Sequence, residues 1–325
     1  MAATSFRARA AQGATAGLLL ALFLFPRVAS NYWLDVFTSA FFYVILALGL
    51  NVVVGFAGLL DLGYAAFFAI GAYTTGILTT VYHVPFLWTV PAAAALAALS
   101  GVVIGAPALR LRSDYLAIVT LGFGEIIRIT AKNLTLTGSA SGIYGIPRPI
   151  VFGHALKTQQ DFYYLLLILA IVTYLAMRRL EHSRVGRAWK YIREDEDAAA
   201  AMGIDPFRYK LLAFVVGAVV GGLAGTVFAV RMTAIAPESF GFMQSVLILL
   251  AVILGGLGRL PGVVLGAFLI VLLPEAMREF ASWRYFLFGA LLIAMMHFRP
   301  EGLWPAGRRK MPQGGQAALN GGDGR

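Results

Sequence analysis

Two charged residues within an apolar run are the first candidates for chemistry in this chain. Glu125 and Arg128 lie three residues apart, so on a helix their side chains share one face. Because a lone charge is costly inside a membrane, two opposite charges at this spacing favour an ion pair. The pair either fixes helix packing near the outer membrane face or borders a solute path, and the sequence leaves both open.

A third ionisable residue, Asp61, lies in an apolar stretch that is rich in glycine. A helix interrupted there would free backbone donors and acceptors, which is tolerated at membrane depth only inside protein or beside a watery cavity. We therefore predict a translocation path lined by Gly55, Gly58, Asp61, Gly63, Tyr64 and Gly71.

Residues for enzymatic chemistry are few. The chain has no cysteine, which excludes thiol nucleophiles, disulfides and metal-thiolate sites. Its four histidines, at positions 83, 154, 182 and 297, are far apart and match no metal or nucleophile motif. The phosphate-binding motif G-x-x-x-x-G-K-[ST] is also absent from the sequence. We therefore expect no catalytic residue, no metal site, no cofactor and no enzymatic activity.

One polar segment interrupts the apolar runs. Residues 178–210 hold eight of the 26 Lys and Arg and six of the 16 acidic residues. Within this segment, Asp195, Glu196 and Asp197 precede an alanine-rich run that ends at Gly203. Acids favour a helix N-terminus and glycine favours its end, so the pattern predicts a short capped helix. It is either a solvated surface helix or a rigid lever that meets a cytoplasmic partner.

Composition places the chain in the membrane. Hydrophobic residues make up 59%, charged residues 13%, and mean hydropathy is +0.78, whereas soluble proteins carry about 25% charged residues. Apolar runs of about 20 residues span the bilayer as helices. We predict an all-α membrane protein with about ten transmembrane helices, at 14–29, 34–56, 60–80, 86–107, 113–131, 162–178, 210–231, 243–258, 261–277 and 283–298. The transmembrane domain is expected over 1–306, with a cytoplasmic loop at 179–209 and a disordered cytoplasmic tail at 307–325.

The basic residues predict the orientation. With the N-terminus inside, 18 Lys and Arg fall on the cytoplasmic side and 8 outside, as the positive-inside rule requires. Both termini are then cytoplasmic. The net charge of +10 reflects this topology, so no nucleic-acid partner is expected. The first span has an alternative interpretation as a cleavable signal peptide, because small residues follow its apolar core at 28–30.

Glycines recur four residues apart at 217, 221 and 225 and again at 258, 262 and 266. Such spacing favours close helix packing. Two glycine turns, at 55–58 and 255–258, also occupy corresponding positions in the two halves of the chain. They hint at the internal repeats with interrupted helices found in many transporters.

The short helix carries a family resemblance. Asp197-Ala198-Ala199, followed after three residues by Gly203, resembles the E-A-A-x-x-x-G loop by which permeases of ATP-binding cassette (ABC) importers dock into their ATPase subunits. Asp replaces the usual Glu, and a later Leu-Pro is absent, which fits permeases with shorter loops. The resemblance assigns ATPase coupling to Glu196, Asp197, Ala198, Ala199 and Gly203.

Further segments narrow the resemblance to the LivM-type permeases of branched-chain amino-acid ABC importers, namely residues 50–58, 62–73, 113–125, 137–147, 183–189 and 298–303. This resemblance implies a subunit of a bacterial inner-membrane importer for Leu, Ile and Val. It also implies a second, LivH-type permease, two cytoplasmic ATPase subunits and an external binding protein. Other amino acids, urea or short amides remain alternative cargo. An ion-coupled secondary transporter is a further alternative, although only Asp61 and Glu125 offer ionisable groups for it.

Overall fold

A computed structural model describes residues 17, 20–111, 113–151 and 153–277, together with positions 283, 286, 289, 290, 293, 302 and 303. Of the predicted span 14–29, residues 17 and 20–29 are described, and residues 20–27 are helical. Most of the predicted span 283–298, and all of the predicted tail 307–325, lie outside the described residues. The other eight predicted spans each coincide with a helix.

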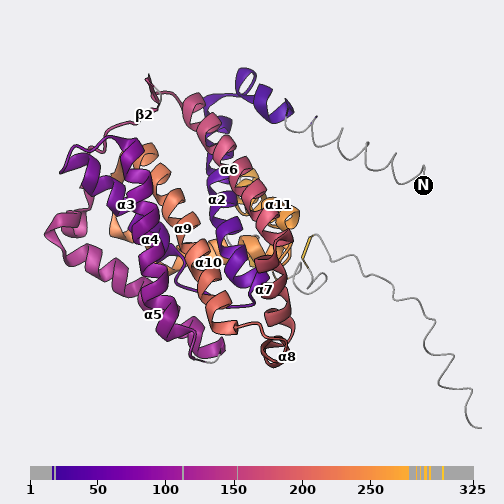
Figure 1. Cartoon of the computed structure of the whole chain (residues 1–325). Coiled ribbons are helices and arrows are strands. Elements are labelled where there is room, and N and C mark those ends of the chain that lie inside the picture. The colour runs from indigo at the N-terminus through magenta and orange to yellow at the C-terminus, as the bar shows by residue number, and fades with distance from the viewer. Residues whose placement is uncertain are drawn as a thin grey trace, which may run out of the picture.

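These helices are long and run through the bundle (Figure 1). They are α2 (Asn31–Asn51), α3 (Ala65–Thr80), α4 (Phe86–Ala108), α5 (Ser113–Asn133), α6 (Gln159–His182), α9 (Pro206–Met232), α10 (Phe242–Gly255) and α11 (Leu260–Ala276). A π-helix, Val52–Phe56, extends α2. Two short helices, α7 (Arg184–Glu194) and α8 (Glu196–Ala201), fill the polar loop.

Five helical segments of the described chain are long and apolar enough to cross a membrane: Asn31–Phe56, Phe86–Ala108, Gln159–His182, Pro206–Met232 and Pro237–Gly255. Ala65–Thr80 and Leu260–Ala276 are shorter apolar helices. The chain is therefore a helical, multi-span membrane protein, and the total of about ten spans stays a prediction. The predicted span 60–80 begins later than expected, at Ala65, because the segment before it is not helical.

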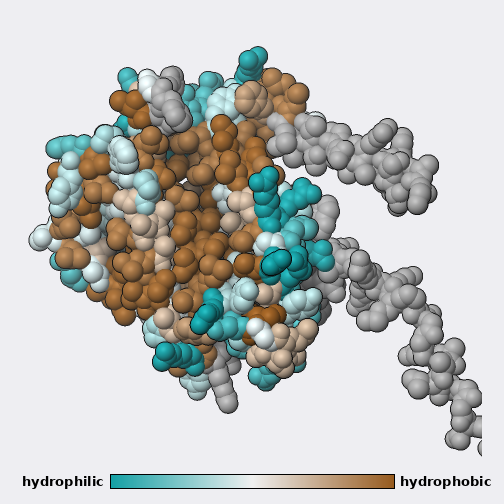
Figure 2. Space-filling view, viewed as in Figure 1, coloured by the Kyte–Doolittle hydropathy of each residue, from teal (hydrophilic) through white to brown (hydrophobic). Residues whose placement is uncertain are grey.

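The core is built around α2, which packs against α6, α9, α10 and α11 (Figure 1). Helix α9 lies in turn against α3 and α4. Apolar side chains also remain on the outside, such as Leu99 and Val103 of α4 and Ile118 of α5. In Figure 2 a band of hydrophobic surface runs through the middle of the molecule, with hydrophilic residues at the top, at the bottom and also along the right side. This band is what a bilayer requires of a lipid-facing surface.

The two ends of the bundle differ. One, which we call the strand end, carries the antiparallel pairs β1 (Ile143–Tyr144) with β4 (Ala234–Ile235) and β2 (Ile150–Val151) with β3 (His154–Ala155). The other, the α8 end, carries α7, α8 and the turn between α10 and α11. Residues 302–303 lie at the α8 end, where the Leu303 amide donates to the Leu254 carbonyl. Leu22 lies at the strand end, where its carbonyl accepts from the Tyr163 hydroxyl near the start of α6.

Candidate functional site: a helix break beneath a short exposed helix

Helix α2 loses its regular geometry before it reaches the α8 end. Its last turn is the π-helix Val52–Phe56, closed by hydrogen bonds from the Ala57 amide to Val52 O (3.1 Å) and from the Leu59 amide to Val53 O (3.0 Å). Gly58 then takes a φ of +72°, which favours glycine, and α3 begins only at Ala65. The interruption predicted around Asp61 is thus present over 57–64, which we call the helix break. π-helices are rare and often lie at functional sites.

Several backbone donors in and next to the helix break are bonded within the chain. The Leu62 amide donates to Thr120 Oγ1 of α5 (3.1 Å), the Gly63 amide to Asp61 Oδ1 (2.9 Å), and the Ala65 amide to Ser245 Oγ of α10 (2.9 Å). The Tyr64 hydroxyl donates to a carbonyl of α9, Gly217 O (3.0 Å). Three helices therefore hold the break in place, as buried backbone groups require.

Asp61 itself is fully buried. Only one of its carboxylate oxygens is used by the backbone, since Oδ2 has no hydrogen-bond partner among the described residues. A carboxylate oxygen left without a donor inside protein is costly. The break thus contains one polar atom that local packing does not explain.

The predicted path glycines are contact points between helices. An added Cβ would lie 2.0 Å from Asn51 Oδ1 at Gly55, 1.9 Å from Thr120 O at Gly63, and 2.0 Å from a carbonyl of α9 at Gly71. Gly71 lies inside the continuous helix α3 rather than in the break. These positions have no open space beside them in this structure, and their place along a solute path stays a prediction.

The two glycine stripes, which are the glycines spaced four residues apart at 217–225 and at 258–266, also mediate packing. A Cβ at Gly225 would meet Phe68 O of α3 at 2.2 Å, and one at Gly266 would meet Ala251 O of α10 at 2.1 Å. The close helix packing predicted from their spacing is confirmed for both stripes.

The two glycine turns that occupy corresponding positions in the sequence meet in space. Gly256 and Gly258 connect α10 to α11 with φ values of +104° and +79°. The Gly258 amide donates to Asn51 Oδ1 (2.9 Å), and a Cβ at Gly258 would lie 2.9 Å from Gly55 O. The C-terminal part of α2, with its π-helix, is therefore joined directly to the turn that follows α10.

The short helix predicted in the polar loop is present as α8. Its N-cap is Asp195, whose Oδ1 accepts from the Ala198 amide (2.9 Å). Gly203 ends the turn with a φ of +84°, and its amide donates to Ala200 O (2.9 Å). A Cβ at Gly203 would meet nothing within 4 Å, so glycine is there for its backbone conformation.

Most of α8 faces away from the protein. Glu196, Asp197 and Ala198 are exposed, as is Gly203 after the helix, whereas Ala199 is buried. Lys210 of α9 bonds to Glu196 and ties the helix to the bundle. The five residues that the family resemblance singled out thus gather on one small projection, with Ala199 as its anchor.

Helix α7 connects this projection to the helix break, which the sequence did not indicate. Trp189 is fully buried, stacks on Phe56 of the π-helix (centroids 6.5 Å apart, planes at 14°) and donates to Tyr209 O (2.6 Å). Arg193 donates from its guanidinium to Gly55 O. Trp189 and Arg193 lie more than 100 residues from their partners in the π-helix, Phe56 and Gly55, beyond what local spacing can reveal.

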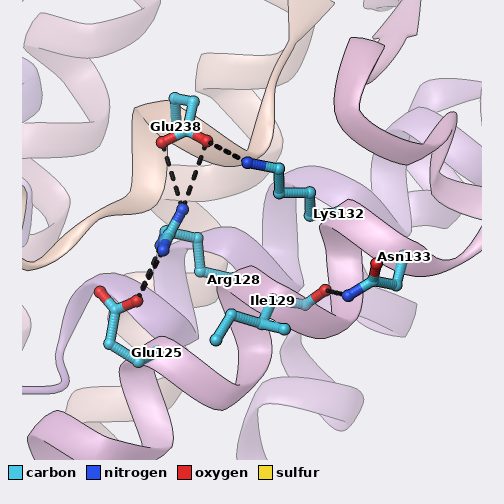
Figure 3. A network of polar contacts seen from close by, with 6 residues as sticks. All are labelled: Glu125, Arg128, Ile129, Lys132, Asn133 and Glu238. Carbon is cyan, nitrogen blue, oxygen red and sulfur yellow. Dashed lines mark hydrogen bonds and ion pairs between the residues drawn. The ribbon is translucent and has the colours of Figure 1, made fainter.

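The predicted pair of Glu125 and Arg128 is confirmed, with a carboxylate–guanidinium distance of 2.9 Å (Figure 3). The structure adds Glu238, whose carboxylate lies 3.2 Å from Arg128 and 3.4 Å from Lys132. Glu238 belongs to the turn Pro237–Phe240 before α10. The network therefore links α5 to that turn near the strand end. Among the described residues, no group of three or more His, Asp or Glu could hold a metal ion.

Comparison with known proteins decides the family. Residues 32–296 match the profile of a family described as "Branched-chain amino acid transport system / permease component". The chain belongs to this permease family. Its members move solutes, so the activity of this chain is transport rather than catalysis of a reaction.

Individual relatives agree with the assignment. The permease protein LivM of Escherichia coli K12, named for high-affinity branched-chain amino acid transport, is 42% identical over 90% of this chain and 75% of its own length. A LivM protein of Methanocaldococcus jannaschii is 26% identical, covering 81% of this chain and 90% of its own. LivH of Escherichia coli K12 is 25% identical over 80% of this chain and 90% of its own. No solved structure matches the chain.

Proposed function

We propose that this permease is one membrane subunit of an ATP-driven importer for branched-chain amino acids, located in a bacterial inner membrane. The observation that carries the proposal is α8, a capped and exposed helix on a permease chain whose sequence has no nucleotide-binding motif of its own. Energy from ATP must then arrive through a protein contact. The names of the relatives supply the class of solute, Leu, Ile and Val.

In this proposal α8 docks into one of two cytoplasmic ATPase subunits. Glu196, Asp197 and Ala198 form the exposed face of the helix, Ala199 anchors it, and Gly203 closes it. A short helix capped at both ends moves as a rigid body, because its terminal backbone groups are already bonded. It can therefore pass on displacement without unfolding.

A second, LivH-type permease completes the membrane part. This chain is similar to both LivM and LivH of one organism, so two related chains of that organism share its sequence pattern. We expect this chain to pair with such a second permease, with the solute path between the two chains. An external binding protein would then bind at the strand end. The permease domain extends over 1–306, and residues 307–325 form a cytoplasmic tail.

The path borders the helix break. Leu60 is 38% exposed there. The predicted lining residues Gly55, Gly58, Gly63 and Tyr64 lie in or beside the same segment, and Gly71 lies further along, in α3. Because those glycines are packed, rearrangement of the break would be needed to open the path. Asp61 places a buried polar atom beside it, suited to an ammonium group that passes.

One observation favours a second candidate function. The fully buried Asp61, with an oxygen that lacks a donor among the described residues, is the kind of carboxylate that ion-coupled secondary transporters use. Cargo other than Leu, Ile and Val, such as other amino acids, urea or short amides, leaves the ATP-driven mechanism unchanged.

Substitution of Gly203 tests the proposal. Gly203→Val meets no steric obstacle, but it forces a branched residue into left-handed backbone at a cost of about 1–2 kcal/mol. We expect uptake to fall while the protein remains in the membrane and the ATPase subunits continue to hydrolyse ATP. Gly203→Asn is the matched control, since Asn tolerates this conformation, and it should transport normally.

Full uptake coupled to ATP hydrolysis in Gly203→Val would contradict the role of α8. Uptake that stops when an uncoupler removes the proton gradient, with ATP held constant, would support the secondary transporter instead.

A further inference from the structure

We propose that Arg193 transmits the movement of α8 to the helix break, as a positioning residue for the gating of transport. The inference rests on the proposed function, in which α8 docks into an ATPase. Arg193 is the side chain through which docking of α8 changes the membrane-embedded part of this chain.

The first step is the rigid link between α8 and α7. A single residue, Asp195, separates them and belongs to both helix ends. Its amide donates to Tyr191 O of α7 (3.0 Å), and its carboxylate caps α8 at the Ala198 amide (2.9 Å). Because both bonds hold one residue, displacement of α8 must move the end of α7 with it.

The second step is the contact of α7 with the π-helix. Trp189 stacks on the ring of Phe56, and Lys190 Nζ lies 5.9 Å from the centre of the same ring. Lys190 is held in turn by Glu181 of α6 (2.8 Å). One aromatic side chain of the π-helix is thus gripped by two consecutive residues of α7, so the two helices cannot slide independently.

The third step is Arg193 itself, one turn further along α7. Its Nη1 donates to Gly55 O, a carbonyl in the irregular last turn of α2. A Cβ at Gly58 would lie 2.8 Å from Arg193 Cγ, and a Cβ at Gly258 would lie 3.0 Å from Arg193 Nη1. The side chain therefore fills the space that Gly58 and Gly258 leave open, and it touches both glycine turns.

Arg193 contacts a segment whose irregular backbone can change conformation. The π-helix and the left-handed Gly58 are local irregularities, and irregular turns change conformation more readily than a continuous helix. A charged donor on a carbonyl stabilises one arrangement of such a turn. When α7 moves, Gly55 O either follows Arg193 or loses its donor, and both outcomes reshape the break that holds Asp61.

The test uses the whole importer in proteoliposomes, with the co-permease, the ATPases and the binding protein. The chain has no cysteine of its own, so Leu60→Cys reports on the break through its reaction with a hydrophilic maleimide. Labelling is compared between nucleotide-free and vanadate-trapped complexes, and uptake is measured per ATP hydrolysed. Arg193→Met keeps the apolar stem and removes the donors. Arg187→Met is the matched control, because Arg187 lies on the same helix but bonds to His182 O, away from the break.

We expect Arg193→Met to lower uptake per ATP by about fivefold or more and to abolish the difference in Leu60→Cys labelling between the two states, with ATP hydrolysis retained. Arg187→Met should preserve both properties. The inference is overturned if Arg193→Met behaves like the control. If Arg193→Met does not assemble, Arg193→Gln decides by the same readouts, because its amide is too short to make the same bond.

The unchanged complex separates this inference from the proposed function. If it shows no ATP-driven uptake, or if Leu60→Cys is never labelled in any state, the proposed function or the path beside the break is wrong. Loss of coupling confined to the Arg193 variants supports the inference.

Discussion

At the scale of single residues, several polar groups of the candidate site are bonded to partners that are distant in sequence. Arg128 is 21% exposed and lies between Glu125 and Glu238. The Thr120 hydroxyl of α5 accepts a hydrogen bond from the Leu62 amide in the helix break. Such bonds offset the cost of placing charge and backbone donors in an apolar setting. Removal of one partner is therefore costly only where no second partner remains.

This principle predicts graded effects in the Glu125 network. Glu125→Gln should destabilise the purified protein by only about 1 kcal/mol or less, because Arg128 retains Glu238. Replacement of both Glu125 and Glu238 with Gln strands Arg128 and should lower the melting temperature by more than the two single changes together. Adding Arg128→Met to that double variant should recover much of the loss, since no uncompensated charge is then left at position 128.

A further double variant, in which both members of the pair are replaced, separates structure from transport. A Glu125→Gln/Arg128→Met protein that folds normally and transports amino acids supports a structural pair. If that protein folded normally yet carried nothing, Glu125 would belong to the solute path. Thermal unfolding in detergent and uptake in vesicles provide the two measurements.

At the scale of elements, glycine sets how closely helices approach. Helix α3 meets α9 where a Cβ at Gly71 would lie 2.0 Å from Gly222 O, a backbone atom that cannot rotate away. Small residues let helix backbones approach in this way, and packing then drives association in the bilayer. The crossing positions Tyr64 and the helix break against α9, so helix packing and the site depend on the same glycines.

Gly71→Ala should therefore be more harmful than the size of a methyl group suggests. Overpacking of this kind costs about 1–3 kcal/mol, so we expect a clear fall in melting temperature and in the yield of monodisperse protein. Gly122→Ala on α5 is the control, because a Cβ there meets nothing within 4 Å. It should be neutral or stabilise the helix by up to about 1 kcal/mol. Equal stability of both variants would show that α3 and α9 are not held by this contact.

At the scale of the whole molecule, local patterns predicted the elements and missed most contacts between them. The apolar runs gave eight helices because a bilayer fixes the length of a span. Helix α8 could be predicted from Asp195 and Gly203, because helix caps act within one turn. The pair of Glu125 and Arg128 could be predicted because i,i+3 spacing is local.

The contacts of the candidate site come from tertiary packing. Glu238 reaches Arg128 across 110 residues and Arg193 reaches Gly55 across 138. No periodicity or cap encodes such distances. The prediction that grouped Gly71 with the break was wrong, because Gly71 lies inside α3. A glycine alone does not distinguish an interrupted helix from a close contact between two helices. The break itself was predicted from the density of glycine around Asp61, but its bonds to Thr120 and Ser245 were not.

The arrangement of the chain ends and loops yields a prediction for the complete fold in the membrane. Basic residues concentrate at the α8 end, where Arg110, Arg259 and the eight Lys and Arg of residues 178–210 lie. Residues 302–303 lie at this end too, and Leu22 lies at the other. Because positive residues stay in the cytoplasm, we expect the α8 end inside and the strand end outside, with both termini cytoplasmic.

Two exposed positions test this orientation in a background without cysteine. Met202 is 80% exposed beside α8, and Tyr144 is 66% exposed in strand β1. An impermeant thiol reagent added to intact spheroplasts should label Tyr144→Cys, whereas Met202→Cys should react only after the membrane is opened. The unmodified chain, which has no cysteine, gives the background. The reverse pattern would place α8 outside the cell, out of reach of any cytoplasmic ATPase, and would remove the basis for coupling through Arg193 as well.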